Sequence, residues 1–201
     1  MKVGAYCNTP FLKSIIFPMP RSLIDLVEKH HRRSVRLPGF DYRRSGMYFV
    51  TICAKNRECL FGEIQNDNIV LNECGTIALD CWNAIPKHFP HVRLDAFVIM
   101  PNHMHGILHI SSYPHACRGT PWRAPTERKF AQSIAGSLST IVNHFKGAVT
   151  RKMRTLYPTW DSSVWQRNYH ERIIRNPCEL RQCTEYIVEN PKNWEKDEEN
   201  V

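Results

Sequence analysis

The sequence predicts an α+β fold, in which helices cover one face of an antiparallel sheet. Strand-like segments and segments of helical periodicity follow one another, but without the strict strand–helix–strand repeat that is typical of a parallel sheet. The chain has 201 residues, of which 42% are hydrophobic and 23% charged, so it suits one globular domain with extensions. The simplest arrangement of these elements is a ferredoxin-like sheet.

Three segments have the pattern of substantial strands. Residues 47–53 (MYFVTIC) are rich in β-branched and aromatic side chains. Residues 92–100 alternate, and a turn at Pro101-Asn102 leads into residues 103–110, which are expected to return antiparallel to them. Residues 69–71 indicate a further short strand. Strict alternation predicts that one face is shared by Val92, Leu94, Ala96 and Val98.

Three segments have apolar residues at helical spacing. The first helix is expected over residues 73–85, with Asn72 as its N-cap, and the second over residues 133–153. The third begins at Asn176-Pro177 and ends before Pro191, because asparagine is a good cap and proline fits the first helical position.

The two ends of the chain differ in composition from its middle. Residues 1–30 are expected to be a variable extension, residues 31–195 the domain, and residues 196–201 an acidic tail. No segment has the apolar length of a membrane span or the ordered regions of a signal peptide, which favours a cytoplasmic protein. The eight cysteines lack the spacing of a zinc knuckle, so most are expected to be small buried apolar groups.

Positive charge is concentrated in two stretches of a chain whose net charge is +8. Residues 21–57 hold nine Lys/Arg and three Asp/Glu, and residues 118–154 hold eight and one. Basic stretches of this kind favour a polyanion such as nucleic acid as the partner. The side chains expected to contact phosphates are Arg32, Arg33, Arg36, Arg43, Arg44, Lys146 and Arg151.

The run Met100-Pro101-Asn102-His103-Met104-His105-Gly106 is the strongest local signal for chemistry. His103 and His105 are two residues apart, so on a strand they point to the same face and can bind one metal ion together. Gly106 is expected to leave space beside this site. Such a pair also occurs as two ordinary strand histidines, in cupins and in zinc hydrolases, but the mixed, short chain disfavours an all-β cupin and a barrel of ~250 residues.

Tyr186 and Asn190 form a second candidate pair, since residues four apart share one face of a helix. A tyrosine hydroxyl, with a pKa near ~10, is a weak nucleophile unless a metal polarises its target. The alternative interpretation is a tyrosine packed on the core and an asparagine that ends the helix before Pro191. Tyr169 is a rival nucleophile, but the residue four positions later is Ile173, which cannot bind a metal.

Four blocks of the sequence resemble, in order, the single-tyrosine HUH transposase superfamily, where U is any hydrophobic residue. The resemblance spans residues 31–195 and is closest to the REP-associated tyrosine transposases, which accompany repetitive extragenic palindromes. The blocks are residues 32–62 around the first strand, 99–106 with the two histidines, 164–176 with Trp165-Gln166, and 185–191 with Tyr186.

The resemblance implies an enzyme that cleaves and rejoins single-stranded DNA beside hairpins, such as repetitive extragenic palindromes. Tyr186 would form a 5′-phosphotyrosine link, and His103, His105 and Asn190 would hold Mg²⁺ or Mn²⁺. No nucleotide cofactor or membrane is implied; the protein would act at the nucleoid as a monomer or a homodimer.

Two departures from the family pattern keep a second hypothesis open. Asn190 stands where the simplest relatives have glutamine, and Arg172 stands where many have histidine. The alternative function is therefore a catalytically inactive protein, derived from such a transposase, that binds hairpin DNA. A metal-dependent hydrolase of small molecules is a third hypothesis, which would lack salt-sensitive affinity for DNA.

Overall fold

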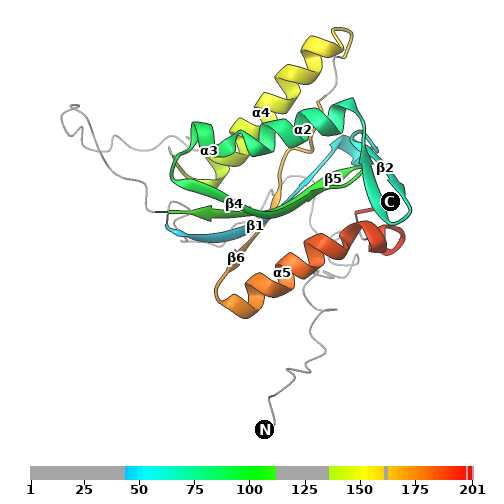
Figure 1. Cartoon of the computed structure of the whole chain (residues 1–201). Coiled ribbons are helices and arrows are strands. Elements are labelled where there is room, and N and C mark those ends of the chain that lie inside the picture. The colour runs from blue at the N-terminus through cyan, green and yellow to red at the C-terminus, as the bar shows by residue number, and fades with distance from the viewer. Residues whose placement is uncertain (1–43, 112–135, 161–162, 198, 201) are drawn as a thin grey trace, which may run out of the picture. The chain divides into compact units, whose positions relative to one another are not determined.

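A computed structural model describes residues 44–111, 136–160, 163–197 and 199–200. Its main sheet has four strands in the order β4-β5-β1-β6, and every neighbouring pair is antiparallel (Figure 1). The strands are β1 (Gly46–Cys53), β4 (Val92–Ile99), β5 (His103–Ile110) and β6 (His170–Ile174). The predicted α+β class is confirmed, and the His103–His105 segment lies on a central strand. A separate hairpin pairs β2 (Gly62–Gln65) with β3 (Asn68–Leu71).

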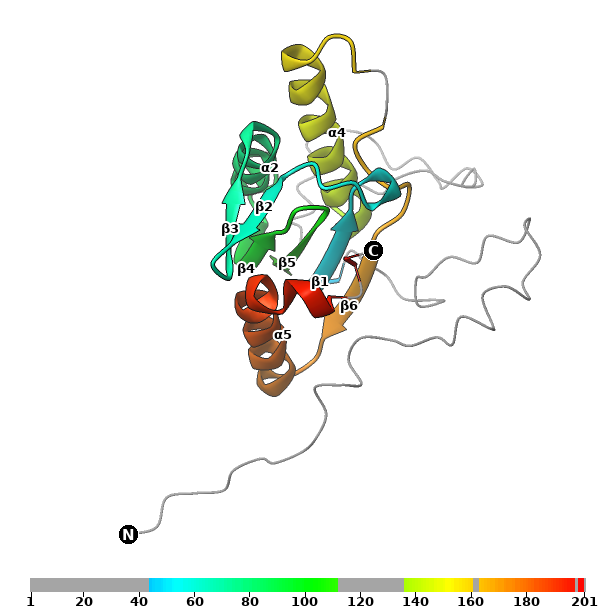
Figure 2. The same cartoon turned by 90° about the vertical axis from the view of Figure 1, so that its right-hand side faces the viewer.

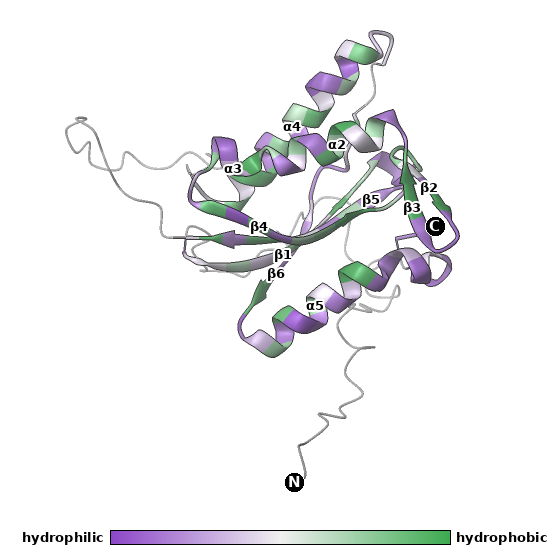
Figure 3. Cartoon of the chain, viewed as in Figure 1, coloured by the Kyte–Doolittle hydropathy of each residue, from purple (hydrophilic) through white to green (hydrophobic). Residues whose placement is uncertain are grey.

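The longer helices begin at the kind of capping residue that the sequence indicates. Each cap side chain accepts a hydrogen bond from a backbone N–H in the first turn, as Asn72 does from Gly75. Figure 3 shows that hydrophobic and hydrophilic residues alternate along the helices, as expected where only one side packs on the sheet. The helices are α2 (Glu73–Asn83), α3 (Ile85–His88), α4 (Leu138–Leu156) and α5 (Pro177–Glu189), with two 3-10 turns, η1 (Lys55–Arg57) and η2 (Asn190–Lys196).

Helices lie on both faces of the sheet (Figures 1 and 2). α2 and α4 cover one face, over a core that includes Val50 and Leu108. α5 covers the other face, where Ile187 packs with Ile107. The expectation that all helices share one face is therefore wrong for α5. The physical reason is that both faces of the central strands carry large apolar side chains, and each face must be removed from water.

A bulge in β4 changes which of its side chains face which layer. The pairing with β5 shifts between Leu94 and Phe97. Val92 and Leu94 pack into the core under α2 and α4, whereas Ala96 and Val98 pack with Ile107 and Ile187 under α5. The single shared face predicted from strict alternation is thus wrong, because one extra residue in a bulge inverts the alternation beyond it.

Gly106 lies against Trp82 rather than beside the histidines. A Cβ added at Gly106 would lie 2.4 Å from Cζ2 of Trp82, which is on α2. Even-numbered residues of β5 face α2 and α4, so the expected role of Gly106 beside the histidine site is wrong. Its lack of a side chain instead lets α2 approach the sheet closely.

We expect Gly106→Ala to destabilise the protein by about 1–3 kcal/mol, because the indole must move within a closely packed core. Gly147→Ala is the matched control, since a Cβ there meets only the flexible end of Arg151, at 3.3 Å. Alanine in the middle of α4 should raise stability by about 0.5–1 kcal/mol. Urea unfolding of both variants measures the difference, and equal stabilities would contradict the close contact with Trp82.

No helix in the described ranges is long and apolar enough to cross a membrane.

Candidate functional site

His103 and His105 face each other on β5, under α5. Their side chains are buried, with 0% and 2% of the residue surface exposed. The two Nε2 atoms are 3.0 Å apart. Two nitrogen ligands at about 2.1 Å from one ion are about 3.0 Å apart when they subtend a right angle. The pair thus already has the spacing of two ligands of one metal ion.

A hydrogen-bond partner fixes the other nitrogen of each ring. Nδ1 of His103 is 2.8 Å from Oδ1 of Asn102, and the Asn102 amide donates to the carbonyl of Glu199 at 2.7 Å. An amide oxygen only accepts, so Nδ1 of His103 carries the proton and its Nε2 lone pair points to the site. Nδ1 of His105 is 2.8 Å from the hydroxyl of Thr51, which can donate or accept.

Thr51 and Asn102 were not predicted as site residues. Asn102 could have been found, because it directly precedes His103 in the motif. Thr51 could not, because its role depends on the register that sets it opposite His105 across β1 and β5.

Burial keeps both imidazoles neutral. It lowers the pKa of His103, while the carboxylates of Asp197 and Glu199 act in the opposite direction. Burial also lowers the pKa of His105 well below its usual value, and His103 lowers it further. Because a metal competes with protons for these nitrogens, neutral rings are ready to bind one.

Asp197 supplies a carboxylate next to the histidine pair. Its side chain is 2% exposed, and Oδ2 lies 3.8 Å from Nε2 of His103. The three side chains His103, His105 and Asp197 offer ligand atoms that all lie within 4.8 Å of one another. Two imidazoles and a carboxylate form a donor set that suits a divalent cation.

Asn190 is buried beside Asp197, with 2% of its surface exposed. Its amide nitrogen donates to Oδ2 of Asp197 at 2.7 Å. Its Oδ1 is also buried and has no hydrogen-bond partner among the described residues. A buried, unpaired carbonyl oxygen beside a ligand cluster is a further group that fits a cation.

The structure brings Tyr186 to the histidines. Its hydroxyl lies 3.4 Å from Nε2 of His105, and the two rings are in edge contact at 5.0 Å. Phe49 packs against both rings and holds them in place. Tyr169, the rival, instead packs against the core under α2 and α4, on the opposite face.

The acidic end of the chain returns to this site. Glu199 forms an ion pair with Arg57, and its carboxylate accepts a hydrogen bond from Sγ of Cys53 at 3.3 Å. Asp197 and Glu199 were expected in an acidic tail, and neither was predicted as a site residue. Their charge alone gave no signal, because charged residues at a chain end are usually solvated.

Comparison with known proteins gives one close relative in sequence. A protein of Haemophilus influenzae described as an "Uncharacterized protein" is 44% identical over 169 residues, which cover 84% of this chain and 93% of the relative. The two proteins belong to one family. No family model matches the sequence.

A solved structure, described as the REP-associated tyrosine transposase bound to a REP hairpin, gives the fold. It is 18% identical, covers 83% of this chain and 74% of its own, and has a TM-score of 0.51. The chain has the fold of a REP-associated tyrosine transposase.

In this REP-associated transposase fold, two further residues of β6 lie on the histidine face. His170 pairs with Thr51, and Arg172 pairs with Phe49. Residues directly opposite in an antiparallel pair share a face, so both side chains lie on the side of the sheet that carries the histidines. His170 is exposed there, and Arg172 is half-buried.

The predicted DNA-contacting residues have different surroundings. Arg44 is exposed before β1. Arg151 is exposed on α4, whereas the ammonium of Lys146 donates to backbone carbonyls of the segment before β6. The remaining four lie outside the described residues: Arg32, Arg33, Arg36 and Arg43.

We expect Cys53 to resist alkylation in the folded protein. Burial, together with the Glu199 carboxylate, raises the pKa of its thiol to about 12. At pH 8 its thiolate fraction should be on the order of 10⁻⁴, so its alkylation should be slower than that of the exposed Cys59. Peptide mapping after iodoacetamide treatment measures both rates, with the exposed Cys178 as a second reference.

Glu199→Gln should increase the rate at Cys53, because it removes a carboxylate that disfavours the thiolate, and should leave the rate at Cys178 unchanged. Equal rates at Cys53 and Cys59 in the unsubstituted protein would show that residue 199 does not cover this end of β1 in solution.

Proposed function

We propose that this protein is a transposase-type nuclease that cleaves and rejoins single-stranded DNA beside hairpins. The observation that carries the proposal is the position of the Tyr186 hydroxyl, 3.4 Å from Nε2 of His105 and next to the candidate metal ligands. A nucleophile beside a cation-binding group is the arrangement that phosphoryl transfer needs. The solved relative of the same fold binds a REP hairpin, which supports a hairpin as the substrate.

The proposed step exchanges one phosphodiester for another. The oxygen of Tyr186 attacks the phosphorus, a bond forms between them, and the bond from phosphorus to the 3′-oxygen breaks. The 3′-oxygen leaves as a hydroxyl after protonation, and the strand that carries the 5′-phosphate stays on the tyrosine. The phenolic proton passes to a water or to a base on the same face, for which His170 is placed. The second step is the reverse, with a 3′-hydroxyl that displaces Tyr186.

His103, His105, Asp197 and Asn190 would hold a divalent ion, which we propose to be Mg²⁺ or Mn²⁺. When bound, the ion would neutralise charge that develops on the phosphate. The protein's own contribution is to hold the rings: Thr51 and Asn102 orient the imidazoles, and Phe49 fixes Tyr186 against His105. No nucleotide cofactor is required, because the phosphotyrosine retains the energy of the phosphodiester.

The test is the formation of a covalent adduct between protein and DNA. The substrates are labelled hairpins with single-stranded flanks, copied from any imperfect palindromes that sequencing finds next to the gene. Incubation with Mg²⁺ or Mn²⁺ should give a labelled protein band that survives denaturing electrophoresis. Excess EDTA should prevent it, and a matched duplex without a hairpin should give none.

Binding of the hairpin without cleavage under any divalent ion would favour the alternative function, a hairpin-binding protein derived from a transposase. Absence of both binding and cleavage would reject the proposal and would leave a hydrolase of small molecules as the next candidate.

A further inference from the structure

We propose that a basic cavity between α4 and residues 163–167 binds backbone phosphates of the same DNA strand that reaches the histidine site. The inference rests on the proposed function, and it assigns a second contact on the other side of β1.

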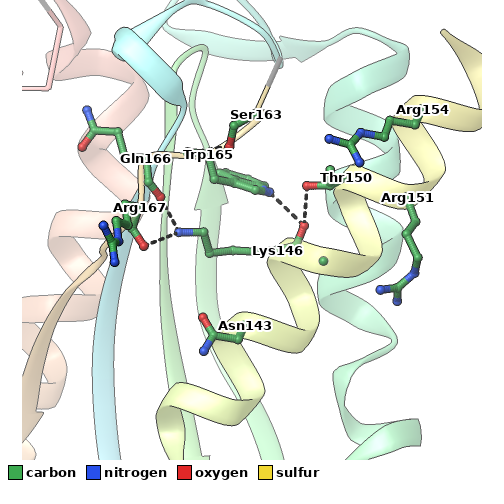
Figure 4. Close-up of a pocket in the computed structure, with 10 residues that line it drawn as sticks. Asn143, Lys146, Thr150, Arg151, Arg154, Ser163, Trp165, Gln166 and Arg167 are labelled. Carbon is green, nitrogen blue, oxygen red and sulfur yellow. Dashed lines mark hydrogen bonds between the residues drawn. The ribbon is translucent and has the colours of Figure 1, made fainter. Parts of the chain in front are cut away.

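The cavity has a volume of about 420 Å³ and is lined by four basic side chains. Arg151 and Arg154 project from α4, and Arg167 comes from the opposite wall, with Lys146 between them (Figure 4). None of the lining residues is acidic. In the part of the chain that the structure describes, no carboxylate forms an ion pair with these three arginines. Such a cluster favours an anion, and guanidinium groups match the oxygens of phosphate well.

Lys146 stabilises the cavity wall formed by residues 163–167, and we do not assign it a contact with the phosphate. Its ammonium donates to the carbonyls of Gln166 at 2.5 Å and Asn168 at 3.3 Å. Burial lowers its pKa to about 8, so at neutral pH it stays mostly charged and keeps these bonds. We therefore assign the phosphate contacts to the arginines, and the expectation that Lys146 contacts phosphate stays a prediction.

Trp165 makes the same wall rigid. Its indole nitrogen donates to the carbonyl of Lys146 at 3.2 Å, and its ring packs against Phe61 and Phe145 in the core. The hydroxyl of Thr150 donates a hydrogen bond to the same carbonyl. A preformed wall lowers the entropy that binding would otherwise cost. The fold therefore holds one wall of this open cavity in place, while its three arginines are exposed to solvent.

The cavity lies one strand away from the histidine strand. The backbone N–H of Gln166 donates to the carbonyl of Cys53 at 3.0 Å, and Cys53 is the partner of His103 across β1 and β5. Two strand spacings of ~4.8 Å separate the backbones of Gln166 and His103 by roughly 10 Å. The cavity lies on the α4 face, opposite the histidines, so a strand with one phosphate at Tyr186 would pass round the sheet edge at residues 163–167 to place another phosphate in the cavity.

The test compares two double variants of equal net charge. Arg151→Gln with Arg154→Gln removes two cations of the cavity. Lys152→Gln with Lys87→Gln removes two exposed lysines outside it, one of them on the same helix. Affinity for the labelled hairpin with single-stranded flanks is measured over a range of salt concentrations.

We expect the arginine variant to lower the affinity and to reduce the slope of log K against log salt by about 0.7 for each lost phosphate contact. The lysine variant should keep the slope of the unsubstituted protein. Circular dichroism should show the same fold in both, because all four side chains are exposed.

A methylphosphonate scan of the flanking strand then locates the contact. Neutral linkages that weaken binding to the unsubstituted protein should have no further effect on the arginine variant. Competition by inorganic phosphate at constant ionic strength separates a site for free phosphate from one for DNA.

An unchanged slope in the arginine variant, with the hairpin still bound, would overturn the assignment of this cavity and leave the proposed function intact. Equal losses in both double variants would also overturn it, because they would reflect net charge alone. Failure of the unsubstituted protein to bind the hairpin would instead reject the proposed function.

Discussion

Replacing Tyr186 with phenylalanine is expected to abolish cleavage and the covalent adduct, with a loss of at least ~10³-fold in rate, because the substitution removes the hydroxyl that we propose as the nucleophile. The hydroxyl lies 3.4 Å from His105, whereas the ring remains free to pack against Phe49 as before. The free energy of unfolding should therefore change by no more than about 1 kcal/mol, and binding of the hairpin should persist.

Tyr169→Phe is the matched control, since it removes the same atom from a tyrosine on the opposite side of the sheet. This variant should retain cleavage and the adduct. Peptide mapping of the trapped adduct from the unsubstituted protein identifies the modified tyrosine directly. A phosphate on Tyr169, or undiminished cleavage by the Tyr186 variant, would show that α5 does not supply the nucleophile.

Replacing His103 and His105 with alanine should remove metal binding and cleavage together while most of the affinity for the hairpin remains. Both rings point their Nε2 atoms at one point, and no other described cluster of His, Cys, Asp and Glu side chains has comparable spacing. Calorimetric titration with Mn²⁺ measures the first effect, and the adduct assay measures the second. Undiminished cleavage by the double variant, or in excess EDTA, would exclude the metal from the reaction.

Asp197→Asn tests the third candidate ligand and leaves no cavity in the protein. It keeps the size of the side chain and a hydrogen-bonding group for Asn190, but it removes the charge. Loss of an outer partner of a metal site typically costs ~10–100-fold in affinity, and loss of a direct ligand should cost at least as much. Glu195→Gln, at an exposed position two residues earlier, should change the affinity little. Equal affinities for Asp197→Asn and the unsubstituted protein would remove Asp197 from the ligand set.

Much of the fold could be predicted from the pattern of residues within short stretches of the sequence. The strand predicted at 47–53, the hairpin of β4 and β5, and the helix caps at Asn72 and Asn176 are confirmed, because they depend on neighbours within a few residues. The strand β6 was missed, because His170-Glu171-Arg172 interrupts its apolar pattern and only pairing with β1 stabilises it. The start of α4 at Leu138, later than predicted, was decided by the cap at Ser137.

The sequence by itself determined which side chains could carry the chemistry. Two histidines on alternate residues of a strand must share a face, and a tyrosine and an asparagine four apart must share one side of a helix. These relations follow from the repeat of the backbone and hold wherever the elements lie. They were enough to predict His103, His105, Tyr186 and Asn190 as candidate site residues from the sequence alone.

Only the tertiary structure decided which of these groups meet and what completes them. Thr51 reaches His105 through a strand register, and Asp197 reaches His103 across 94 residues of chain (197 minus 103) because the segment after α5 folds back over the sheet. Tyr186, and not Tyr169, lies beside His105 because α5 covers the face of the sheet that carries the histidines. Such contacts are set by the burial of both faces of the sheet, a property of the whole chain that no local repeat encodes.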